Sequence, residues 1–329
     1  MKTVHRWLAA AAIVAGCAGL APGAGAADKI RLAYGDVPSV ESLNMLIAFE
    51  RARARGVEVE LTSVKEEDLA AQAVVTGEAD VGVGTPYALL QKVKAPIRMF
   101  FQLSTLRFYT VVNKEYYQSW KDLDGQEIAV HSRGSGTEAI MKLMAEKHGI
   151  HYSKISYVPG SEVRAGALLQ GTVKASIVDA ANWRLIQEKA PGKFMTLPME
   201  GVNASDETLY ANEEFLKTHA DAVDVLVEEL LKTWREIDAD PKAVARLRDE
   251  MKLLPELPAE LVAEIDPYYV EATAAHTFPL NGGGPDAAKD DFAFYGLAGQ
   301  LSGDPASLKV EDFWDFGPLD RALAKLGRR

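Results

Sequence analysis

The chain has 329 residues, one cysteine and a formal net charge of −11. A negative charge of this size argues against nucleic acid and anionic membranes as partners, because both repel acidic proteins. A single cysteine excludes a disulfide framework, and the six histidines show no metal-ligating spacing. We therefore expect a protein without a bound metal or cofactor.

Residues 1–27 have the organisation of a secretory signal. Lys2 and Arg6 precede an apolar run, and the small residues at 24–27 resemble an Ala-x-Ala cleavage site. Cleavage there would remove both cations and lower the net charge from −11 to −13. Residues 14–17 also resemble a lipobox. We expect a periplasmic protein, and the alternative is a lipoprotein anchored at Cys17.

Residues 28–106 predict an α/β lobe. Apolar runs predict strands at residues 29–34, 57–61, 81–83 and 97–103. Helical periodicity fills residues 43–55 and 69–76, and a third helix begins after Thr85 and Pro86. Strands that alternate with helices in this way form a mostly parallel sheet. We interpret Glu66, Glu67 and Asp68 as a solvated helix start.

Residues 107–208 repeat this organisation. The break at residues 104–107 suits a chain that passes from one lobe to another. Further strands are predicted at residues 108–112, 128–130, 155–158 and 175–178, with helices at 139–144 and 165–169. Two lobes of similar build imply a cleft between them. In such sheets ligands bind beyond the carboxyl ends of the strands.

Helical patterns dominate after residue 212. They cover residues 222–237, 241–253, 257–265 and 319–326, and we expect these helices to support the first lobe. The predicted organisation is a signal peptide at 1–27, lobe 1 at 28–106 plus 209–329, and lobe 2 at 107–208.

The loop at residues 132–137 is the main candidate for an anion site. It follows an apolar strand and precedes a helix, so free backbone N–H groups and the positive helix end coincide there. Its residues are Ser132, Arg133, Gly134, Ser135, Gly136 and Thr137. An ordinary N-cap is the competing interpretation. The spacing Gly134-x-Gly136-x-x-Ala139 also matches a dinucleotide fingerprint, but no acidic residue lies about 20 positions further on.

Other polar side chains fall at or near predicted strand ends. Asp179, Asn182 and Trp183 follow one strand and could form a cleft wall. Arg107, at the predicted lobe crossing, could pair with a carboxylate or sulfonate. For each, a structural role is the alternative. His131 is also interpreted as structural, and Ser135 has no obvious base for nucleophilic chemistry.

Four segments together resemble a known family. They are residues 77–86, 122–130, 132–136 and 315–323. The chain resembles periplasmic solute-binding proteins of ABC importers, in the nitrate/sulfonate/taurine branch that is related in fold to thiamine-precursor binders. The resemblance implies a type II binding protein in which two α/β lobes, joined by two strand crossings, close around a small organic anion.

The resemblance also implies where the ligand would be held. Together with the residue analysis it gives the expected ligand-binding set: Gly35, Asp36, Val37, Ser39, Thr85, Tyr87, Arg107, Ser132, Arg133, Gly134, Ser135, Gly136, Thr137, Asp179, Asn182 and Trp183. The cysteine-rich motif of the thiamine-precursor synthases with this fold is absent. We expect a monomeric, non-enzymatic protein that delivers a sulfonate or carboxylate to a membrane permease. A secreted enzyme that uses the same cleft, or a receptor that presents its ligand to a sensor or to another type of transporter, is the alternative.

Overall fold

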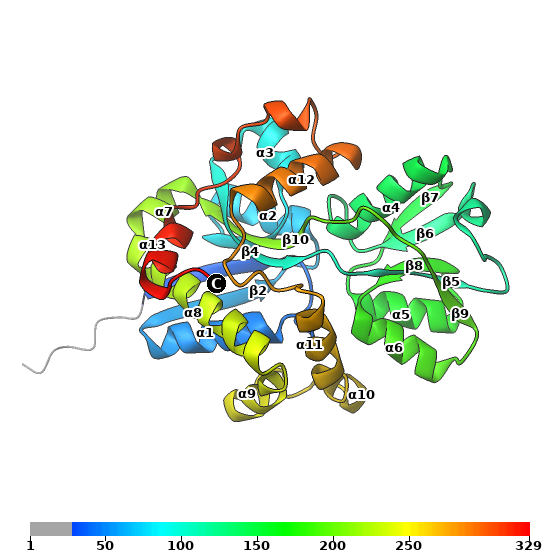
Figure 1. Ribbon diagram of the computed structural model, residues 1–329, viewed down its shortest axis with the longest axis horizontal. Helices are drawn as coiled ribbons and strands as arrows, with labels where there is room; N and C mark the ends of the chain where they lie inside the picture. The colour runs from blue at the N-terminus through cyan, green and yellow to red at the C-terminus, as the bar shows by residue number, and fades with distance from the viewer. Residues whose placement is uncertain (1–27) are drawn as a thin grey trace, which may run out of the picture.

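A computed structural model describes residues 28–329 of the chain. The expected signal peptide and Cys17 lie outside the described residues. Two five-stranded sheets, each flanked by helices, lie side by side and define two lobes (Figure 1). The predicted two-lobe α/β fold class is therefore confirmed.

Lobe 1 contains the first four strands of the described chain and one strand that returns late. Its sheet has the order β2-β1-β3-β10-β4. The strands are β1 (Asp28–Tyr34), β2 (Val57–Ser63), β3 (Val81–Gly84), β4 (Ile97–Thr105) and β10 (Ser205–Asn212). β1 is parallel to β2 and β3, whereas β10 is antiparallel to both β3 and β4.

Lobe 2 has the corresponding sheet order β7-β6-β8-β5-β9. Its strands are β5 (Tyr109–Asn113), β6 (Glu127–Val130), β7 (Lys154–Tyr157), β8 (Ala175–Val178) and β9 (Phe194–Leu197). β6 is parallel to β7 and β8, and β5 is antiparallel to β8 and β9. Each sheet thus contains one strand that runs against its neighbours.

Helices cover both sheets. Lobe 2 has α4 (Gly136–His148), α5 (Ser161–Gln170) and α6 (Ala180–Lys189). Lobe 1 has α1 (Leu43–Ala54), α2 (Glu67–Thr76), α3 (Tyr87–Val93), α7 (Glu213–Thr218), α8 (Ala220–Ala239), α9 (Ala243–Met251), α10 (Ala259–Val262), α11 (Ile265–Ala274), α12 (Pro285–Leu297) and α13 (Gly317–Leu326). Short 3₁₀ helices lie at Trp120–Leu123, Pro305–Ser307 and Val310–Asp312. None of the described helices is long and apolar enough to cross a bilayer.

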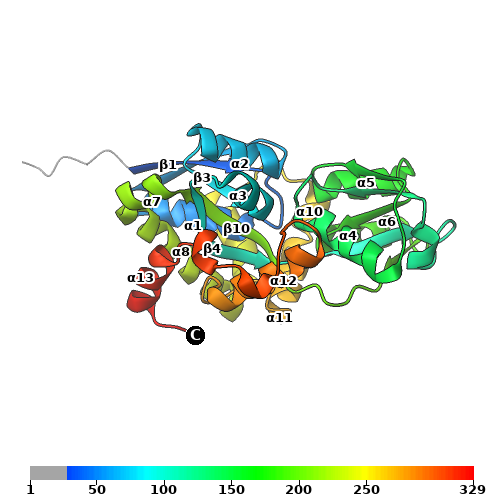
Figure 2. The same ribbon diagram turned by 90° about the horizontal axis from the view of Figure 1, so that it is seen from above.

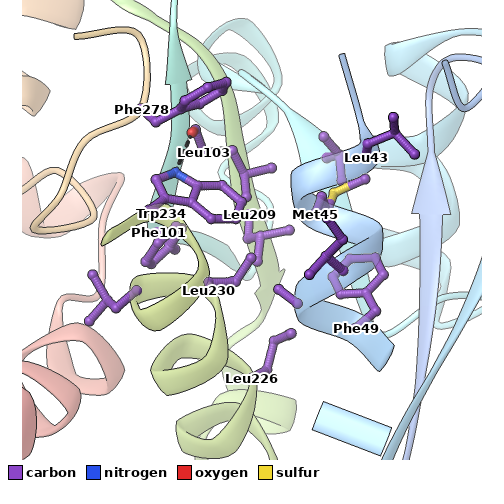
Figure 3. Packing of buried hydrophobic residues seen from close by; sticks show 14 of the residues in the cluster. Leu43, Met45, Phe49, Phe101, Leu103, Leu209, Leu226, Leu230, Trp234 and Phe278 are labelled. Carbon is purple, nitrogen blue, oxygen red and sulfur yellow. Dashed lines mark hydrogen bonds between the residues drawn. The ribbon is translucent and has the colours of Figure 1, made fainter. Parts of the chain in front are cut away.

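The core of lobe 1 lies between its sheet and the long helix α8. Trp234 of α8 is fully buried, and its indole N–H donates to the carbonyl of Leu103 on β4 at 2.8 Å. Figure 3 shows Leu226, Leu230 and Trp234 facing the apolar side chains of α1 and the sheet. The apolar stripe that predicts a helix at residues 222–237 is therefore the face that α8 buries.

The sequence prediction missed several elements. α6, β9, β10 and α12 were not predicted, and the helix expected at residues 257–265 is instead the short α10 followed by α11. β10 is the most important omission, because it carries the chain back from lobe 2 into the middle of the first sheet. It begins with Ser205, Asp206 and Glu207, and this polar start obscured the apolar residues that follow. Figure 2 shows the chain crossing between the lobes from above.

Candidate functional site

A cavity with an empty volume of about 460 Å³ lies between the two lobes. Lobe 1 and the crossing segments contribute Tyr34, Gly35, Asp36, Glu41, Glu67, Val83, Phe108, Asp206 and Glu207. Lobe 2 contributes His131, Ser135, Gly136, Thr137, Ser161 and Arg164. We call this space the interlobe cavity.

Gly35, at the end of β1, allows α2 to approach the cavity. A Cβ atom at this position would lie 2.7 Å from the backbone N and Cα of Glu67, which is too close for any other residue. A Cβ at Gly84 would lie 2.8 Å from the Glu67 carboxylate. The two glycines therefore let the first turn of α2 place the carboxylate of Glu67 in the cavity wall.

The N-terminus of α4 forms part of the wall from lobe 2. Ser135 caps this helix: its Oγ accepts from the Glu138 N–H at 3.3 Å and donates to the Ser132 carbonyl at 2.8 Å. Three amides of the expected anion loop are already occupied. The Gly134 N–H donates to the Glu138 carboxylate at 2.8 Å, the Ser132 N–H to Ser135 Oγ at 3.4 Å, and the Ser135 N–H to the Ser132 carbonyl at 3.4 Å. The cavity is therefore lined by the later part of the loop, Ser135 to Thr137.

Arg164 is the one arginine or lysine among the residues that line the cavity. Its side chain is 2% exposed and comes from α5. Nε donates to the Ile177 carbonyl at 2.8 Å, and Nη1 donates to the Val158 carbonyl at 2.9 Å. These bonds fix the plane of the guanidinium, yet Arg164 forms no ion pair with any residue in the described range 28–329. Burial lowers the pKa of Arg164, and the charges of Asp36, Asp179, Glu41 and Glu162 oppose this shift although none of them forms an ion pair with the guanidinium.

The opposite wall of the cavity is acidic. Burial and then the nearby Glu207 raise the pKa of Glu67 to about 8, and burial and then Asp36 raise that of Glu207 to about 7. Burial raises the pKa of Asp36 to about 6. The pKa values of Glu41 and Asp206 are also raised, again chiefly by burial. These five carboxyl groups, from Asp36, Glu41, Glu67, Asp206 and Glu207, are called the acidic wall below.

His131 connects the two lobes. Its Nε2 lies 3.0 Å from the Gly35 carbonyl of lobe 1, and its Nδ1 accepts from the Gly160 N–H at 3.2 Å. This arrangement requires the neutral ring with the proton on Nε2. Burial and then the charge of Arg164 lower the pKa of His131 to about 4, in agreement with a neutral ring. His131 thus holds the end of β1 against lobe 2.

Ion pairs add a second connection between the lobes. Arg184 of α6 pairs with Glu264 at 2.6 Å and with Glu271 of α11. Arg107 reaches Glu271 from the crossing segment at 3.2 Å, and the Tyr109 hydroxyl donates to the same carboxylate. The two lobes are therefore in contact through His131 and through these ion pairs.

The structure brings together only part of the site expected from the sequence. Of that set, the cavity is lined by Gly35, Asp36, Ser135, Gly136 and Thr137. Thr85 and Gly134 line an adjacent hollow that shares Glu67 with the cavity. Ser132 is fully buried behind the loop. Val37 is 45% exposed, and Ser39 hydrogen-bonds within the turn before α1, so neither lines the cavity.

The aromatic and charged candidates require larger corrections. Tyr87 points into lobe 1, where its hydroxyl donates to Asp291 at 2.5 Å, because the first turn of α3 packs against α12. Trp183 packs against the small core of lobe 2 on the outward face of α6. Arg107 is held by Glu271 and lines an adjacent hollow that shares Glu41, Asp206 and Glu207 with the cavity. The exposed Arg133 lies over the ring of Tyr157 at 5.1 Å. None of these four side chains lines the interlobe cavity.

Asp179 and Asn182 serve the helix instead of the cavity. Asp179 caps α6 by accepting from the Asn182 N–H at 2.8 Å, and it also accepts from the Asn182 side-chain amide at 2.7 Å. The sequence prediction placed these residues at a strand end but did not recognise the helix that follows. Neither residue is part of the cavity wall.

Most of the charged cavity residues were missed. Glu67 was interpreted as a solvated helix residue, yet the glycines at 35 and 84 place it in the cavity. Asp206 and Glu207 lie on the unpredicted β10, and Arg164 lies in the first turn of α5, just before the helix expected from residue 165. In the described residues, no group of three or more His, Cys, Asp or Glu side chains is arranged to hold a metal ion.

Comparison with known proteins gives a family and a fold. A sequence model described as NMT1/THI5 like matches residues 53–244, and no curated protein sequence matches the chain. A structure from Bordetella bronchiseptica RB50 is 21% identical, with a TM-score of 0.73 over 91% of this chain and 98% of that one.

Two further structures carry functional descriptions. The nitrate-binding protein NrtA from Synechocystis PCC 6803 is 13% identical, with a TM-score of 0.68 over 91% of this chain and 89% of its own. The alkanesulfonate-binding protein SsuA from Xanthomonas axonopodis pv. citri, bound to MOPS, is 14% identical, with a TM-score of 0.62 over 87% and 98%. The structural similarity establishes a shared periplasmic binding protein fold, as the sequence resemblance implied. Because the identities are this low, it establishes the fold alone.

Proposed function

The chain belongs to the NMT1/THI5-like family, and from this premise and the interlobe cavity we propose that it is an extracytoplasmic solute-binding protein. The protein would capture a small organic molecule between its lobes and deliver it to an ABC permease in the membrane. Residues 1–27 would direct the chain to the periplasm.

The observation that carries this proposal is the cavity itself. It is lined by residues from both lobes, and no ion pair is formed in the described residues by Arg164, Glu41, Glu67, Asp206 or Glu207. A closed two-lobe protein exposes such groups when it opens and covers them again around a ligand. The anionic group expected from the sequence would bind at Arg164 and at the N-terminus of α4.

The proposal can be tested on protein that has been unfolded, dialysed and refolded to remove any bound molecule. Thermal unfolding is then measured with and without the small-molecule fraction of a culture extract. We expect a rise in Tm, because a ligand that binds only the folded state stabilises it. We also expect a smaller radius of gyration in solution scattering as the lobes close.

A matched pair of glycine variants locates the effect. A Cβ atom at Gly136 would lie 2.4 Å from Leu106 Cδ2 and 3.2 Å from Asp206 Oδ1, so Gly136→Leu obstructs closure of the cavity. Gly166 on α5 has open space at the same position, and Gly166→Leu serves as the control. Stabilisation should disappear in the first variant and persist in the second. Equal stabilisation of both would contradict binding in the interlobe cavity.

A further inference from the structure

Helix α6 belongs to lobe 2 by its place in the chain, but it packs into the cores of both lobes. Ile186 is part of the small core of lobe 2, and Trp183 packs against that core. Ala181 and Leu185 are buried in the core of lobe 1, which also contains Tyr268 of α11. Helices α6 and α11 are in direct contact. Separation of α6 from α11 would therefore expose apolar surface to water, which is unfavourable.

Charged side chains from both lobes meet beside this apolar contact. Arg184 of α6 donates to the Glu264 carboxylate at 2.6 Å and also donates to Glu271 of α11. Nζ of Lys189, at the end of α6, lies 3.4 Å from Oε1 of Glu260 on α10. In each of these pairs lobe 2 supplies the base and lobe 1 supplies the acid. Complementary charges of this kind attract the two lobes toward each other.

Glu271 is the centre of this cluster. Its carboxylate accepts from Arg184 of lobe 2, from the Tyr109 hydroxyl at the start of β5 and, at 3.2 Å, from Arg107 in the crossing segment. Burial favours the neutral acid, but these three donors outweigh burial and lower the pKa of Glu271 from its ordinary value. One carboxylate of lobe 1 is thus bonded both to lobe 2 and to the chain that joins the lobes.

The cluster lies outside the interlobe cavity. Arg184, Glu264 and Glu271 do not line the cavity wall. Two-lobe proteins open by bending at a hinge, and a rotation that moved α6 away from α11 would break these ion pairs. The cluster can therefore influence the balance between open and closed lobes without touching a ligand.

We propose that Arg184, Lys189, Glu260, Glu264 and Glu271 form an ionic clamp that holds the two lobes closed in the absence of a ligand. Every side chain of the clamp is partly exposed, and ion pairs of this kind contribute little individually, so the lobes can still open. Salt screens partly exposed charges, so the closed fraction depends on ionic strength. The clamp serves the lobe movement that the proposed function requires, but the closed state itself needs no ligand.

Pulsed electron paramagnetic resonance between two spin labels measures the ratio of open to closed molecules. Gln72→Cys on α2 and Lys142→Cys on α4 place the labels on opposite lobes, because both exposed residues line one hollow between the lobes. Cys17→Ser removes the one native cysteine. The protein is unfolded, dialysed and refolded to remove any bound molecule, and then labelled.

The first measurement varies the salt concentration. In about 0.05 M NaCl we expect most molecules to show the label distance of the closed structure. In about 1 M NaCl the ratio of open to closed molecules should rise about 3-fold or more, because the clamp charges are screened. Solution scattering on unlabelled protein should show a larger radius of gyration at the higher salt concentration.

A matched pair of variants assigns the effect to the clamp. Arg184→Gln removes the charge that joins α6 to Glu264 and Glu271, and the ratio of open to closed molecules should rise about 5-fold at low salt. The variant should also lose most of the salt dependence. Arg246→Gln is the control, because Arg246 pairs with Asp240 within lobe 1 at 3.6 Å. The control should keep both the ratio and the salt dependence of the parent protein.

Three results would overturn the inference. They are an open ligand-free protein at low salt, a ratio that does not change with salt, and an Arg184→Gln variant that behaves like the control. If Arg184→Gln does not fold, the salt dependence of the parent protein decides instead. Each of these results leaves the proposed function intact when the culture extract still raises Tm. A failure of the extract to raise Tm would contradict the proposed function and not the clamp.

Discussion

Two regions of this protein bury carboxyl groups, and their surroundings differ completely. In lobe 1, Asp291 of α12 is fully buried and accepts from the Ser205 N–H at 2.6 Å, the Ser205 hydroxyl at 2.8 Å and the Tyr87 hydroxyl at 2.5 Å. In the acidic wall, Glu41, Glu67 and Glu207 have no ion pair in the described residues. Burial is similar, but Asp291 accepts from three donors, whereas Glu67 accepts from the Thr85 N–H and Glu207 from the Tyr34 hydroxyl.

The comparison distinguishes acids that connect elements of the fold from acids that face the interlobe cavity. Burial raises the pKa of Asp291 to about 6, although three donors stabilise its charged form. Such a group connects elements, here α3, α12 and the start of β10. A buried carboxyl group without an ion pair and with few donors weakens the ligand-free protein, and the proposed ligand would supply the missing partner.

The largest expected effect comes from matched amide substitutions in the two regions. Asp291→Asn places an amide N–H against donors that need an acceptor, and we expect a loss of about 3 kcal/mol in the free energy of unfolding. Glu207→Gln removes a charge from the acidic wall and should stabilise ligand-free protein by about 1 kcal/mol at pH 8. Urea unfolding of both variants measures the contrast. Similar losses would show that the two regions are equivalent.

The pH dependence of stability gives a second test. Folding raises the pKa values of Glu67 and Glu207. At a pH above the pKa of the unfolded state, the folded protein therefore binds more protons than the unfolded protein. Stability of the ligand-free protein should therefore fall between pH 6.5 and 8, by about 1 to 2 kcal/mol. His131 does not oppose this change, because its lowered pKa affects stability only below 6.5.

Urea unfolding at several pH values measures this slope. In the variant with both Glu67→Gln and Glu207→Gln the slope should largely disappear. A slope that persists unchanged would place its origin outside the acidic wall.

The connection through His131 gives a smaller effect. His131→Phe removes the hydrogen bond to the Gly35 carbonyl and leaves an aromatic ring in place. A net loss of about 1 kcal/mol should weaken ligand binding about 5-fold. The extract dilution that gives half of the maximal Tm shift measures this change in ligand affinity. His151→Phe, at an exposed position in lobe 2, should have no effect.

The smallest effect is expected at Arg133. The sequence assigns it to the ligand, but the structure places it on the surface over Tyr157. Arg133→Ala should therefore change ligand affinity less than about 2-fold, as is typical of an exposed side chain. A loss of 10-fold or more in the same titration would restore Arg133 to the binding site.

Sequence reasoning predicted elements from local periodicity, and it failed where distant segments meet. The apolar period of residues 222–237 and the glycine ends of α2 and α5 are local signals, and the structure confirms these helices. The place of Glu67 in the cavity depends on Gly35 and Gly84, which lie far from it along the chain. No periodicity within α2 reveals such an approach.

The candidate site shows the same limit. The small-residue loop before α4 is a local pattern, and part of it does line the cavity. The acidic wall is assembled from the loop after β1, the turn before α1, α2 and β10, so its charge is visible only after folding. Tyr87 and Trp183 were assigned to the cavity because each follows a strand. Each lies on a helix face that packs against a hydrophobic core and not on the face toward the cavity.

The first three residues of β10, Ser205 to Glu207, have different structural roles. Ser205 is fixed by Asp291, whereas Asp206 and Glu207, the next two residues, face the interlobe cavity. If this connector bends when the lobes open, it bends beside Ser205, which Asp291 holds in place. The motion then moves Asp206 and Glu207 relative to the proposed ligand. For the proposed binding function, we therefore expect substitutions here to change ligand selectivity and the rate of ligand release together. Laboratory evolution that alters one of them at positions 205–207 should alter the other.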